Sequence, residues 1–295
     1  MEPASDDEGD TAAAAAPRLL LFVTFVLFCF QPSSRPRGPE PPAVPLLASV
    51  RREAPKPPPA KPRKPKKKIY LTFDDGPNRG TRNVLDIVAD EGVPVSFFLV
   101  GEHVFDSRGQ RALFDSLKAC PHVELCNHSY SHAHHRYTAY YAAPDSVVAD
   151  FRRTHDSLDL ASLVARTPGR NIWRIDSLRA TDLKGSTAAA DSLQRAGFAL
   201  MGWDAEWHFD HKTYNVVQSA ETMLRQIDSV FAGGRTKRPG HLVLLAHDQA
   251  YSASADSLEL RKFLQELKKK EDYELLFATE YPGAVPGADS LLVKK

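Results

Sequence analysis

Thr72-Phe73-Asp74-Asp75-Gly76-Pro77 is the segment of this sequence that reveals most about its architecture. It follows the apolar run Ile69-Tyr70-Leu71, so two adjacent carboxylates stand where a strand runs into a Gly-Pro turn. Catalytic groups of α/β enzymes collect at the carboxyl ends of strands. Adjacent acids repel each other, and the pair is costly unless a cation or a proton offsets the repulsion. The segment therefore predicts a buried strand that delivers two acids to a site.

Strand-like and helix-like segments alternate around and after this point. The expected strands are residues 69–73, 95–100, 123–125, 163–166, 199–203, 242–246 and 275–278. The expected helices are residues 81–91, 111–119, 145–159, 187–196, 215–231 and 255–270. Alternation with apolar strands is typical of a parallel sheet. We therefore predict an α/β fold, a distorted (β/α) barrel of about seven strands, closed or nearly closed, with the active site at the C-terminal strand ends.

Chemically versatile side chains fall at the ends of these expected strands. They are Asp74 and Asp75 on the first, His128 on the third, Arg166 on the fourth, Asp204 on the fifth and His247 on the sixth. Because the carboxyl ends of parallel strands share one face of a barrel, we expect these groups to meet there.

His128 and His132 lie four residues apart in the segment Asn-His-Ser-Tyr-Ser-His, residues 127–132. On a helical turn this spacing brings both imidazoles to one face, as two ligands of one cation require. Together with the acidic pair they indicate a hydrolytic metal centre with an open position. His134 and His135, in the same loop, are expected to be exposed.

The chain resembles the polysaccharide deacetylase family, carbohydrate esterase family 4 with its NodB-homology domain, over about residues 68–280. Residues 72–77 match the family motif Thr-Phe-Asp-Asp-Gly-Pro in full, and residues 128–132 match His-Ser/Thr-x-x-His. Residues 245–247, Leu-Ala-His, match the late motif Leu-x-His. The resemblance implies a metal-dependent hydrolase that removes acetyl groups from an N-acetylated polysaccharide, acting on a non-peptide carbon–nitrogen bond.

Residue by residue, the resemblance implies one divalent metal ion bound by Asp75, His128 and His132. Zn²⁺ is the expected ion, and the ligand set also admits Co²⁺, Ni²⁺ or Mn²⁺. Asp74 would be the general base that takes a proton from the attacking water. His247 would be the general acid that protonates the leaving amine.

A third family motif is altered in this chain. The usual Arg-x-Pro-Tyr/Phe-Gly reads Arg-Thr-Pro-Gly-Arg at residues 166–170. Arg166 would hold Asp74 ionised by ion pairing. Pro168 and Gly169 would border the substrate, and Gly169 could still offer a backbone N–H to an oxyanion. Because Gly169 lacks the usual aromatic wall, Trp173 is expected to refill that space.

The fourth motif is altered as well, in the segment Trp-Asp-Ala-Glu-Trp at residues 203–207. Asp204 would orient His247 and favour its protonated form. Trp207, one residue closer than usual, would stack on a sugar face or the acetyl methyl. Trp203, Trp207 and Trp173 favour a sugar substrate because aromatic faces suit the apolar faces of pyranoses. Core packing is the alternative for each tryptophan.

The N-terminal part of the chain has a different composition. Residues 19–30 are apolar apart from Thr24, with Arg18 before them and a proline-rich stretch after them. This run is shorter than the ~20 residues that span a bilayer, and its layout is that of a secretory signal. We expect an acidic segment with a signal or retained anchor at 1–31, a disordered Pro/Lys-rich linker at 32–67, and the deacetylase domain at 68–295. The expected location is extracytoplasmic: secreted, periplasmic or membrane-anchored.

Charge and cysteine content restrict the partners. The chain has 295 residues and a formal net charge of +1, enough for one large domain. The basic run 51–68 lies outside that domain, so no nucleic-acid partner is expected. Cys120 and Cys126 would lie about 20 Å apart along a strand, beyond disulfide reach, which predicts two separate thiols. The expected partner is an acetylated glycan, and the expected state is a monomer.

Two other functions remain open from the sequence. An esterase that removes O-acetyl groups from a glycan would use the same residues. A non-catalytic glycan-binding protein on the same fold would be expected to have lost the base or a ligand, and this chain retains Asp74, Asp75, His128, His132 and His247. Peptidoglycan, poly-N-acetylglucosamine, chitin fragments and acetylated xylan all fit as substrates.

Overall fold

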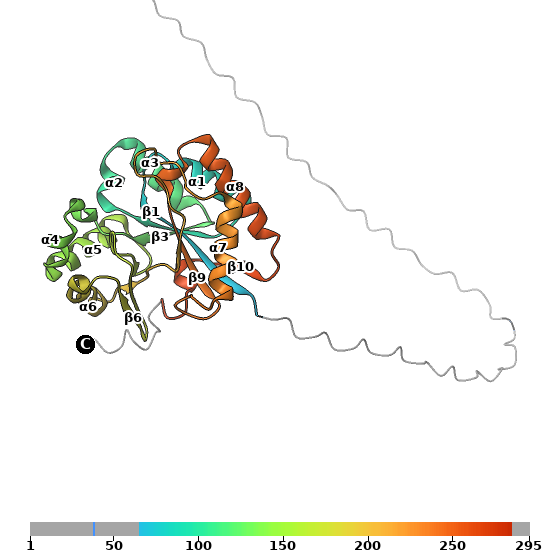
Figure 1. Cartoon of the computed structure of the whole chain (residues 1–295). Coiled ribbons are helices and arrows are strands. Elements are labelled where there is room, and N and C mark those ends of the chain that lie inside the picture. Colours follow the sequence, from blue (N-terminus) through green and yellow to red (C-terminus); the bar gives the residue numbers. More distant parts are fainter. Residues whose placement is uncertain (1–37, 39–64, 285–295) are drawn as a thin grey trace, which may run out of the picture. The chain divides into compact units, whose positions relative to one another are not determined.

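A curled and mostly parallel sheet lies at the centre of the computed structural model, which describes Gly38 and residues 65–284 (Figure 1). The parallel strands, in spatial order, are β7 (Ala199–Leu200), β4 (Val164–Ala165), β3 (Val123–Asn127), β2 (Val95–Leu99), β1 (Lys67–Gly76), β9 (His241–His247) and β8 (Ala205–Glu206). The antiparallel hairpin of β5 (Ile172–Ile175) and β6 (Leu178–Thr181) extends the sheet beyond β7. A further strand, β10 (Tyr273–Leu275), pairs with the start of β1. The predicted distorted (β/α) barrel is confirmed, and β6 and β8 form its open edges.

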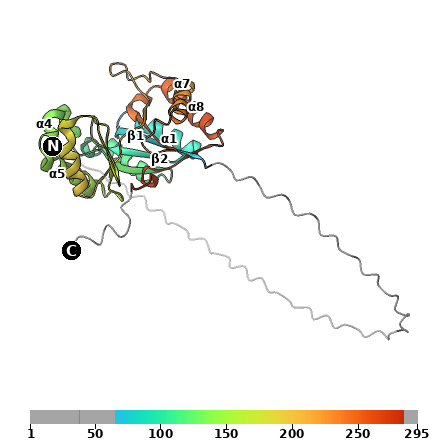
Figure 2. The same cartoon turned by 60° about the horizontal axis from the view of Figure 1, so that its bottom comes forward.

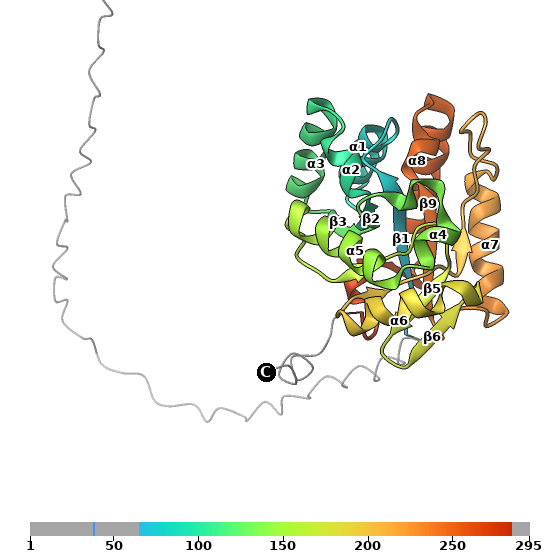
Figure 3. The ribbon, with the colours of Figure 1, turned by 90° about the vertical axis from the view of Figure 1, so that its left-hand side faces the viewer.

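Helices cover the outside of the sheet. They are α1 (Thr81–Glu91), α2 (Gly101–Phe105), α3 (Arg108–Ala119), α4 (Tyr137–Tyr141), α5 (Pro144–Leu158), α6 (Thr187–Arg195), α7 (Ala220–Ala232) and α8 (Ser254–Lys268). Short 3₁₀ turns are η1 (His132–His135), η2 (Lys184–Ser186), η3 (Asp248–Tyr251) and η4 (Ala278–Glu280). Figure 2 shows α7 and α8 together on one side of the sheet and α4 and α5 on the other. Figure 3 shows β1 and β9 side by side at the centre.

Two expected elements differ from the structure. The helix expected over 215–231 begins at Ala220, because the Ser219 hydroxyl accepts the Thr222 N–H and caps the helix there. The strand expected over 275–278 ends at Leu275, since the Glu280 carboxylate accepts the Phe277 N–H at 2.8 Å and starts η4. In both places a side-chain cap sets the boundary, and caps are weaker signals than periodicity.

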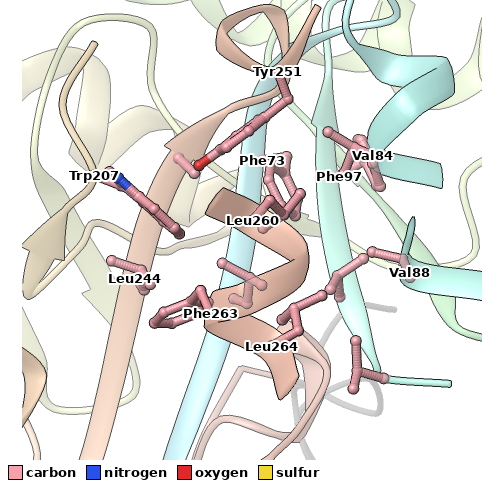
Figure 4. Close-up of a cluster of buried hydrophobic side chains, with 14 of the residues drawn as sticks. Phe73, Val84, Val88, Phe97, Trp207, Leu244, Tyr251, Leu260, Phe263 and Leu264 are labelled. Carbon is pink, nitrogen blue, oxygen red and sulfur yellow. The ribbon is translucent and has the colours of Figure 1, made fainter. Parts of the chain in front are cut away.

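Side chains of β1 alternate between two environments, as a strand requires. Ile69, Leu71 and Phe73 face the outer helices and join the main apolar core. Phe73 stacks on Phe97 with 5.2 Å between ring centroids, beside residues of α1 and α8 (Figure 4). The alternate residues, including Thr72 and Asp74, face the inside of the barrel. The core packing of β1 therefore directs Asp74 inward.

Three remaining expectations can be placed. Cys120 and Cys126 are both free thiols, as predicted. Among the helices of residues 65–284, none is long and apolar enough to cross a bilayer. The expected signal or anchor and the linker, residues 1–31 and 32–67, lie outside the described residues apart from Gly38 and residues 65–67.

Candidate active site

A cleft of about 790 Å³ opens at the carboxyl ends of the parallel strands. It gathers side chains from β1, the loop after β3, the loop after β4 and the end of β9. Its walls include Asp74, Asp75, His128, His132, Trp203 and His247. Residues far apart in the sequence thus meet on the face where the strand order predicted them.

Asp74 and Asp75 both reach the cleft although they are neighbours in a strand. Consecutive strand residues normally point to opposite faces. Here Asp75 has a φ of 71°, and the pairing of β1 with β2 shifts register between Asp74 and Gly76. This irregularity turns the second carboxylate back toward the first. The local backbone of β1 therefore builds an acidic pair on one face.

Asp75, His128 and His132 form a compact set of candidate metal ligands. Oδ1 of Asp75 lies 3.4 Å from Nε2 of His128 and 3.1 Å from Nε2 of His132. One ligand atom from each residue lies within 4.8 Å of the others. Within residues 65–284, this buried Oδ1 has no hydrogen-bond partner. Two imidazoles and one carboxylate suit a divalent ion such as Zn²⁺, so these residues fit the implied metal.

The orientation of His128 supports this assignment. Its Nδ1–H donates to the backbone carbonyl of Arg166 at 3.0 Å. That hydrogen bond fixes the tautomer and leaves the Nε2 lone pair directed at Asp75. Ligating histidines usually make such a bond through their second nitrogen.

His132 reaches the same point through a loop rather than the expected helical turn. Ser129 and His132 have φ values of 67° and 46°, and the Ser129 hydroxyl accepts the His132 N–H at 3.1 Å. The two imidazoles lie together as predicted, but a loop with positive φ values brings them together rather than a helical turn. His134 and His135 are exposed, as predicted, at the rim of the cleft.

The charges in this set are strongly coupled. Burial alone would raise the pKa of Asp75, but His128, His132 and His247 hold that pKa well below its ordinary value. Burial opposes ionisation of His128, yet the Asp74 and Asp75 carboxylates raise its pKa. The carboxylates and imidazoles of this set thus favour each other's charged forms.

Arg166 forms an ion pair with Asp74. Its Nη1 donates to Oδ1 of Asp74 at 2.7 Å and to the Thr72 hydroxyl at 2.8 Å. Its remaining nitrogens donate to the backbone carbonyls of Met201 and Gly202, and its guanidinium lies 4.1 Å from the Phe98 ring centroid. The predicted ion pair between Arg166 and Asp74 is present, and each guanidinium nitrogen of Arg166 has a hydrogen-bond acceptor.

His247 also lies close to Asp75. Its Nε2 lies 3.9 Å from Oδ2 of Asp75, and its ring packs against Phe209 at 5.1 Å between centroids. Its buried Nδ1 has no hydrogen-bond partner in the described part of the chain. His247 is thus positioned by packing and by its place at the end of β9.

The expected contact between Asp204 and His247 is absent from the described structure. Asp204 precedes β8 and accepts the backbone N–H groups of Lys237 at 2.7 Å and Val243 at 2.8 Å. It therefore lies level with the start of β9, four residues before His247. The sequence placed Asp204 at the end of a strand over 199–203. In the structure that strand, β7, ends at Leu200, and the next strand, β8, begins at Ala205. Burial raises the pKa of Asp204 to about 6 despite those hydrogen bonds.

The three tryptophans divide between cleft and core. Trp203 lines the cleft, as predicted. Trp207 is buried against Phe263 (Figure 4), and its indole N–H donates to the Gln218 carbonyl. Trp173 is buried against Tyr281. Stacking on a sugar by Trp207 and Trp173 was therefore a wrong prediction, since both rings complete apolar cores.

In the loop after β4, the predictions for Pro168 and for the space beside Gly169 were wrong. Gly169 lines the cleft with a φ of 61°. Pro168 is buried, and its carbonyl accepts the Tyr141 hydroxyl at 2.6 Å, so its ring does not line the cleft. The space beside Gly169 holds Tyr137 from α4 rather than Trp173.

Several cleft residues had not been singled out in the sequence. They are Glu102, His103, Tyr137, Glu206, Phe209, His211 and Tyr214. His103 contacts the site directly, since its Nδ1 lies 2.8 Å from the Asp75 carbonyl. Glu206 lies within the altered fourth motif, so its position was a usable signal. No local spacing distinguishes His103 or Tyr214.

Sequence comparisons agree with this site. Residues 61–171 match the family described as polysaccharide deacetylase. A chitooligosaccharide deacetylase of Rhizobium leguminosarum bv. phaseoli is 43% identical over 65 residues, 22% of this chain and 27% of that protein. One from Bradyrhizobium sp. is 29% identical over 192 residues, 61% of this chain and 70% of that protein. The match to a second Rhizobium leguminosarum protein, from bv. trifolii, covers 18% of it, so the alignments to the two Rhizobium leguminosarum proteins span well under two thirds of each.

Solved structures share the fold. A family 4 carbohydrate esterase from Streptococcus mutans has a TM-score of 0.55 and 23% identity, covering 72% of this chain and 86% of that one. The catalytic domain of a peptidoglycan N-acetylglucosamine deacetylase from Eubacterium rectale has a TM-score of 0.51 and 20% identity, covering 74% and 91%.

The chain thus has the fold of the family 4 carbohydrate esterases. The predicted resemblance to the polysaccharide deacetylase family is confirmed over residues 61–171.

Proposed function

We propose that this protein is a metal-dependent deacetylase of an N-acetylated polysaccharide, either peptidoglycan or a poly-N-acetylglucosamine or chitin-like glycan. The observation that carries the proposal is the convergence of Asp75, His128 and His132 beside the buried Asp74–Arg166 pair. The match to the polysaccharide deacetylase family and the chitooligosaccharide deacetylases among the relatives support the substrate class.

Asp75, His128 and His132 would hold one divalent ion, with Zn²⁺ the expected one. Such an ion would supply a Lewis acid for the acetyl carbonyl and make water acidic enough to attack near neutral pH. The remaining chemistry belongs to the side chains around it.

Asp74 is placed to act as the general base. Its Oδ1 is held by Arg166, while its Oδ2 lies 3.7 Å from Nε2 of His128, next to the candidate ligands. The carboxylate is thus fixed in orientation with one oxygen directed at the cleft. A base so held would take a proton from water without first reorganising.

His247 is placed to act as the general acid. Its Cα pairs with that of Asp74 across β1 and β9, and its Nε2 lies 3.9 Å from Oδ2 of Asp75, so both groups would reach a substrate bound there. Loss of an amine requires protonation of the nitrogen, which an imidazolium provides. Gly169, which lines the same cleft, would offer its N–H to the developing oxyanion.

The cleft walls fit a sugar polymer. Trp203, Phe209 and Tyr214 line it as aromatic surfaces beside polar groups. Pyranose rings present apolar faces and hydroxyl edges that match such a lining. We also propose an extracytoplasmic location, supported by the signal-like run at residues 19–30 and by the polymeric substrate.

Acetate release by the full chain tests the proposal. The purified protein is offered chitotetraose, peptidoglycan fragments and acetylated xylan, before and after chelation and after Zn²⁺ or Co²⁺ is returned. Chelator-sensitive release from an N-acetylated glycan is expected. Release only from acetylated xylan would favour an O-acetyl esterase. Glycan binding without metal uptake or turnover would favour the non-catalytic alternative.

A further inference from the structure

Tyr137, the first residue of α4, forms the wall of the cleft beside Gly169. A Cβ atom at position 169 would lie 3.1 Å from Cε1 and 3.2 Å from Cζ of the Tyr137 ring. Contacts this short are tighter than most Cβ contacts, so the ring would have to shift by a few tenths of an ångström. The Tyr137 ring therefore lies directly beside position 169, so α4 rather than the loop after β4 supplies this wall.

The ring is held in a defined orientation. It stands edge-on to His132, with 6.0 Å between centroids and an angle of 85°, and edge-on to His135 at 6.4 Å and 87°. Its inner part packs on the apolar cluster around Phe151 and Tyr141. Tyr137 is thus a fixed surface directly beside a candidate metal ligand.

The phenol hydroxyl of Tyr137 differs from those of the other two tyrosines of α4. Tyr140 and Tyr141, in the same helix, donate their hydroxyls to Asp150 and to the Pro168 carbonyl. The Tyr137 hydroxyl makes no hydrogen bond to any residue in the described range, and Tyr137 lines the cleft. A half-buried aromatic ring with a free donor suits a pyranose, which offers an apolar face and hydroxyl or amide oxygens.

We propose that Tyr137 is a substrate-positioning residue that holds the acetylated pyranose against Asp74 and the candidate metal ligands. The inference rests on the proposed deacetylase function. It assigns glycan recognition at this wall to α4, and a side chain at position 169 would require the ring to shift.

Two variants and two substrates test this role. Full-length wild type, Tyr137→Ala and Tyr137→Phe are compared on chitotetraose and on an aryl acetate that carries no sugar. Tyr137→Ala should raise KM for chitotetraose at least tenfold and leave aryl acetate hydrolysis within twofold. Tyr137→Phe keeps the ring and lacks only the hydroxyl, so its KM for chitotetraose should lie between those of wild type and Tyr137→Ala. Leu258→Ala, an exposed change on α8, is the control and should match wild type.

A double-mutant cycle tests the contact with position 169. Gly169→Ala should impair chitotetraose turnover in the wild type, because its methyl group meets the ring. The same change should cost less in Tyr137→Ala, where the ring is gone. The positive φ of Gly169 penalises alanine equally in both backgrounds, so backbone strain cancels in the cycle. Equal effects in both backgrounds would contradict the proposed contact.

Measuring Zn²⁺ binding distinguishes two roles of Tyr137: positioning the substrate, and supporting the candidate ligand His132. Zn²⁺ affinity of Tyr137→Ala, measured by calorimetry, should equal that of wild type. Parallel loss of Zn²⁺ and of both activities would show that Tyr137 only supports His132 and would overturn the inference. Unchanged chitotetraose kinetics would overturn it as well, while the proposed function would stand. A wild type that binds Zn²⁺ but neither binds nor cleaves chitotetraose or peptidoglycan fragments would refute the proposed function, and the inference with it.

Discussion

Nη1 of Arg166 lies 2.7 Å from Oδ1 of Asp74, and the two side chains are 0% and 4% exposed. Every nitrogen of the guanidinium has a hydrogen-bond acceptor, so the buried cation is satisfied as well as paired. Buried pairs of this kind contribute little net stability, but they fix geometry. Here the geometry leaves Oδ2 of Asp74 facing the candidate metal ligands.

Replacing this carboxylate should separate metal binding from catalysis. Asp74→Asn retains an oxygen that can accept the Arg166 N–H, while removing the base. We expect acetate release to fall about 10²- to 10⁴-fold, the usual contribution of a general base. Zn²⁺ stoichiometry, measured by elemental analysis, should be unchanged. Near-normal turnover in this variant would refute the assignment of Asp74 as the base.

Metal binding should depend on the imidazoles of the candidate ligand set. Zn²⁺ at about 100 times its Kd should stabilise the wild type by about 2.7 kcal/mol, because the ion binds only the folded state. His128→Ala and His132→Ala should abolish this stabilisation and acetate release, measured by thermal unfolding with and without Zn²⁺. His134→Ala, at the exposed rim, should respond like wild type. Full Zn²⁺ stabilisation of His128→Ala would rule out the proposed ligand set.

Asp204 should affect stability rather than turnover. Its two oxygens accept two backbone N–H groups, and asparagine can accept only one of them. We expect Asp204→Asn to lose about 1–3 kcal/mol of unfolding free energy at about pH 4, where wild type does not bear the cost of a buried charge, with kcat within twofold of wild type. Loss of kcat at unchanged stability would instead restore the orienting role expected from the motif.

The same residue predicts a pH dependence of stability. Burial raises the pKa of Asp204 from 3.8 to about 6, so the folded state keeps its proton to a higher pH than the unfolded chain. This contribution is therefore complete below pH 3.8 and is lost as the pH rises through 6, by up to about 3 kcal/mol. Denaturant unfolding at several pH values should show that wild type loses this increment relative to Asp204→Asn. A constant difference between the two proteins would contradict the raised pKa.

Gly80 should tolerate no side chain. A Cβ atom there would lie 1.9 Å from the carbonyl oxygen of Asp248, the residue whose buried carboxylate accepts hydrogen bonds from Asn78 and Thr81. Because backbone atoms meet, Gly80→Ala should destabilise the domain by about 3 kcal/mol or more and disturb the loop after Asp75. Gly185→Ala, with nothing within 4 Å, should stay within about 1 kcal/mol. Equal melting temperatures for both variants would contradict this packing.

Much of the fold followed from local pattern. The expected helix at 81–91 coincides with α1, whose apolar residues recur at helical spacing and whose end is capped by Gly92. The long parallel strands followed from their apolar runs. The hairpin β5–β6 and the strand β8 were missed, because segments this short carry no periodicity that distinguishes them from loops.

The metal-ligand set and its neighbouring acid were accessible from residue order, because the carboxyl ends of parallel strands must meet on one face. Asp74, Asp75, His128, Arg166 and His247 needed only that rule. The positions of Asp204, Trp207 and Tyr137 depended on long-range packing: the register of β8 on β9, the closure of the core over Trp207, and the docking of α4 against Gly169. Such contacts join segments whose separation leaves no mark in local spacing, so only the tertiary structure decided which aromatic residues face the cleft.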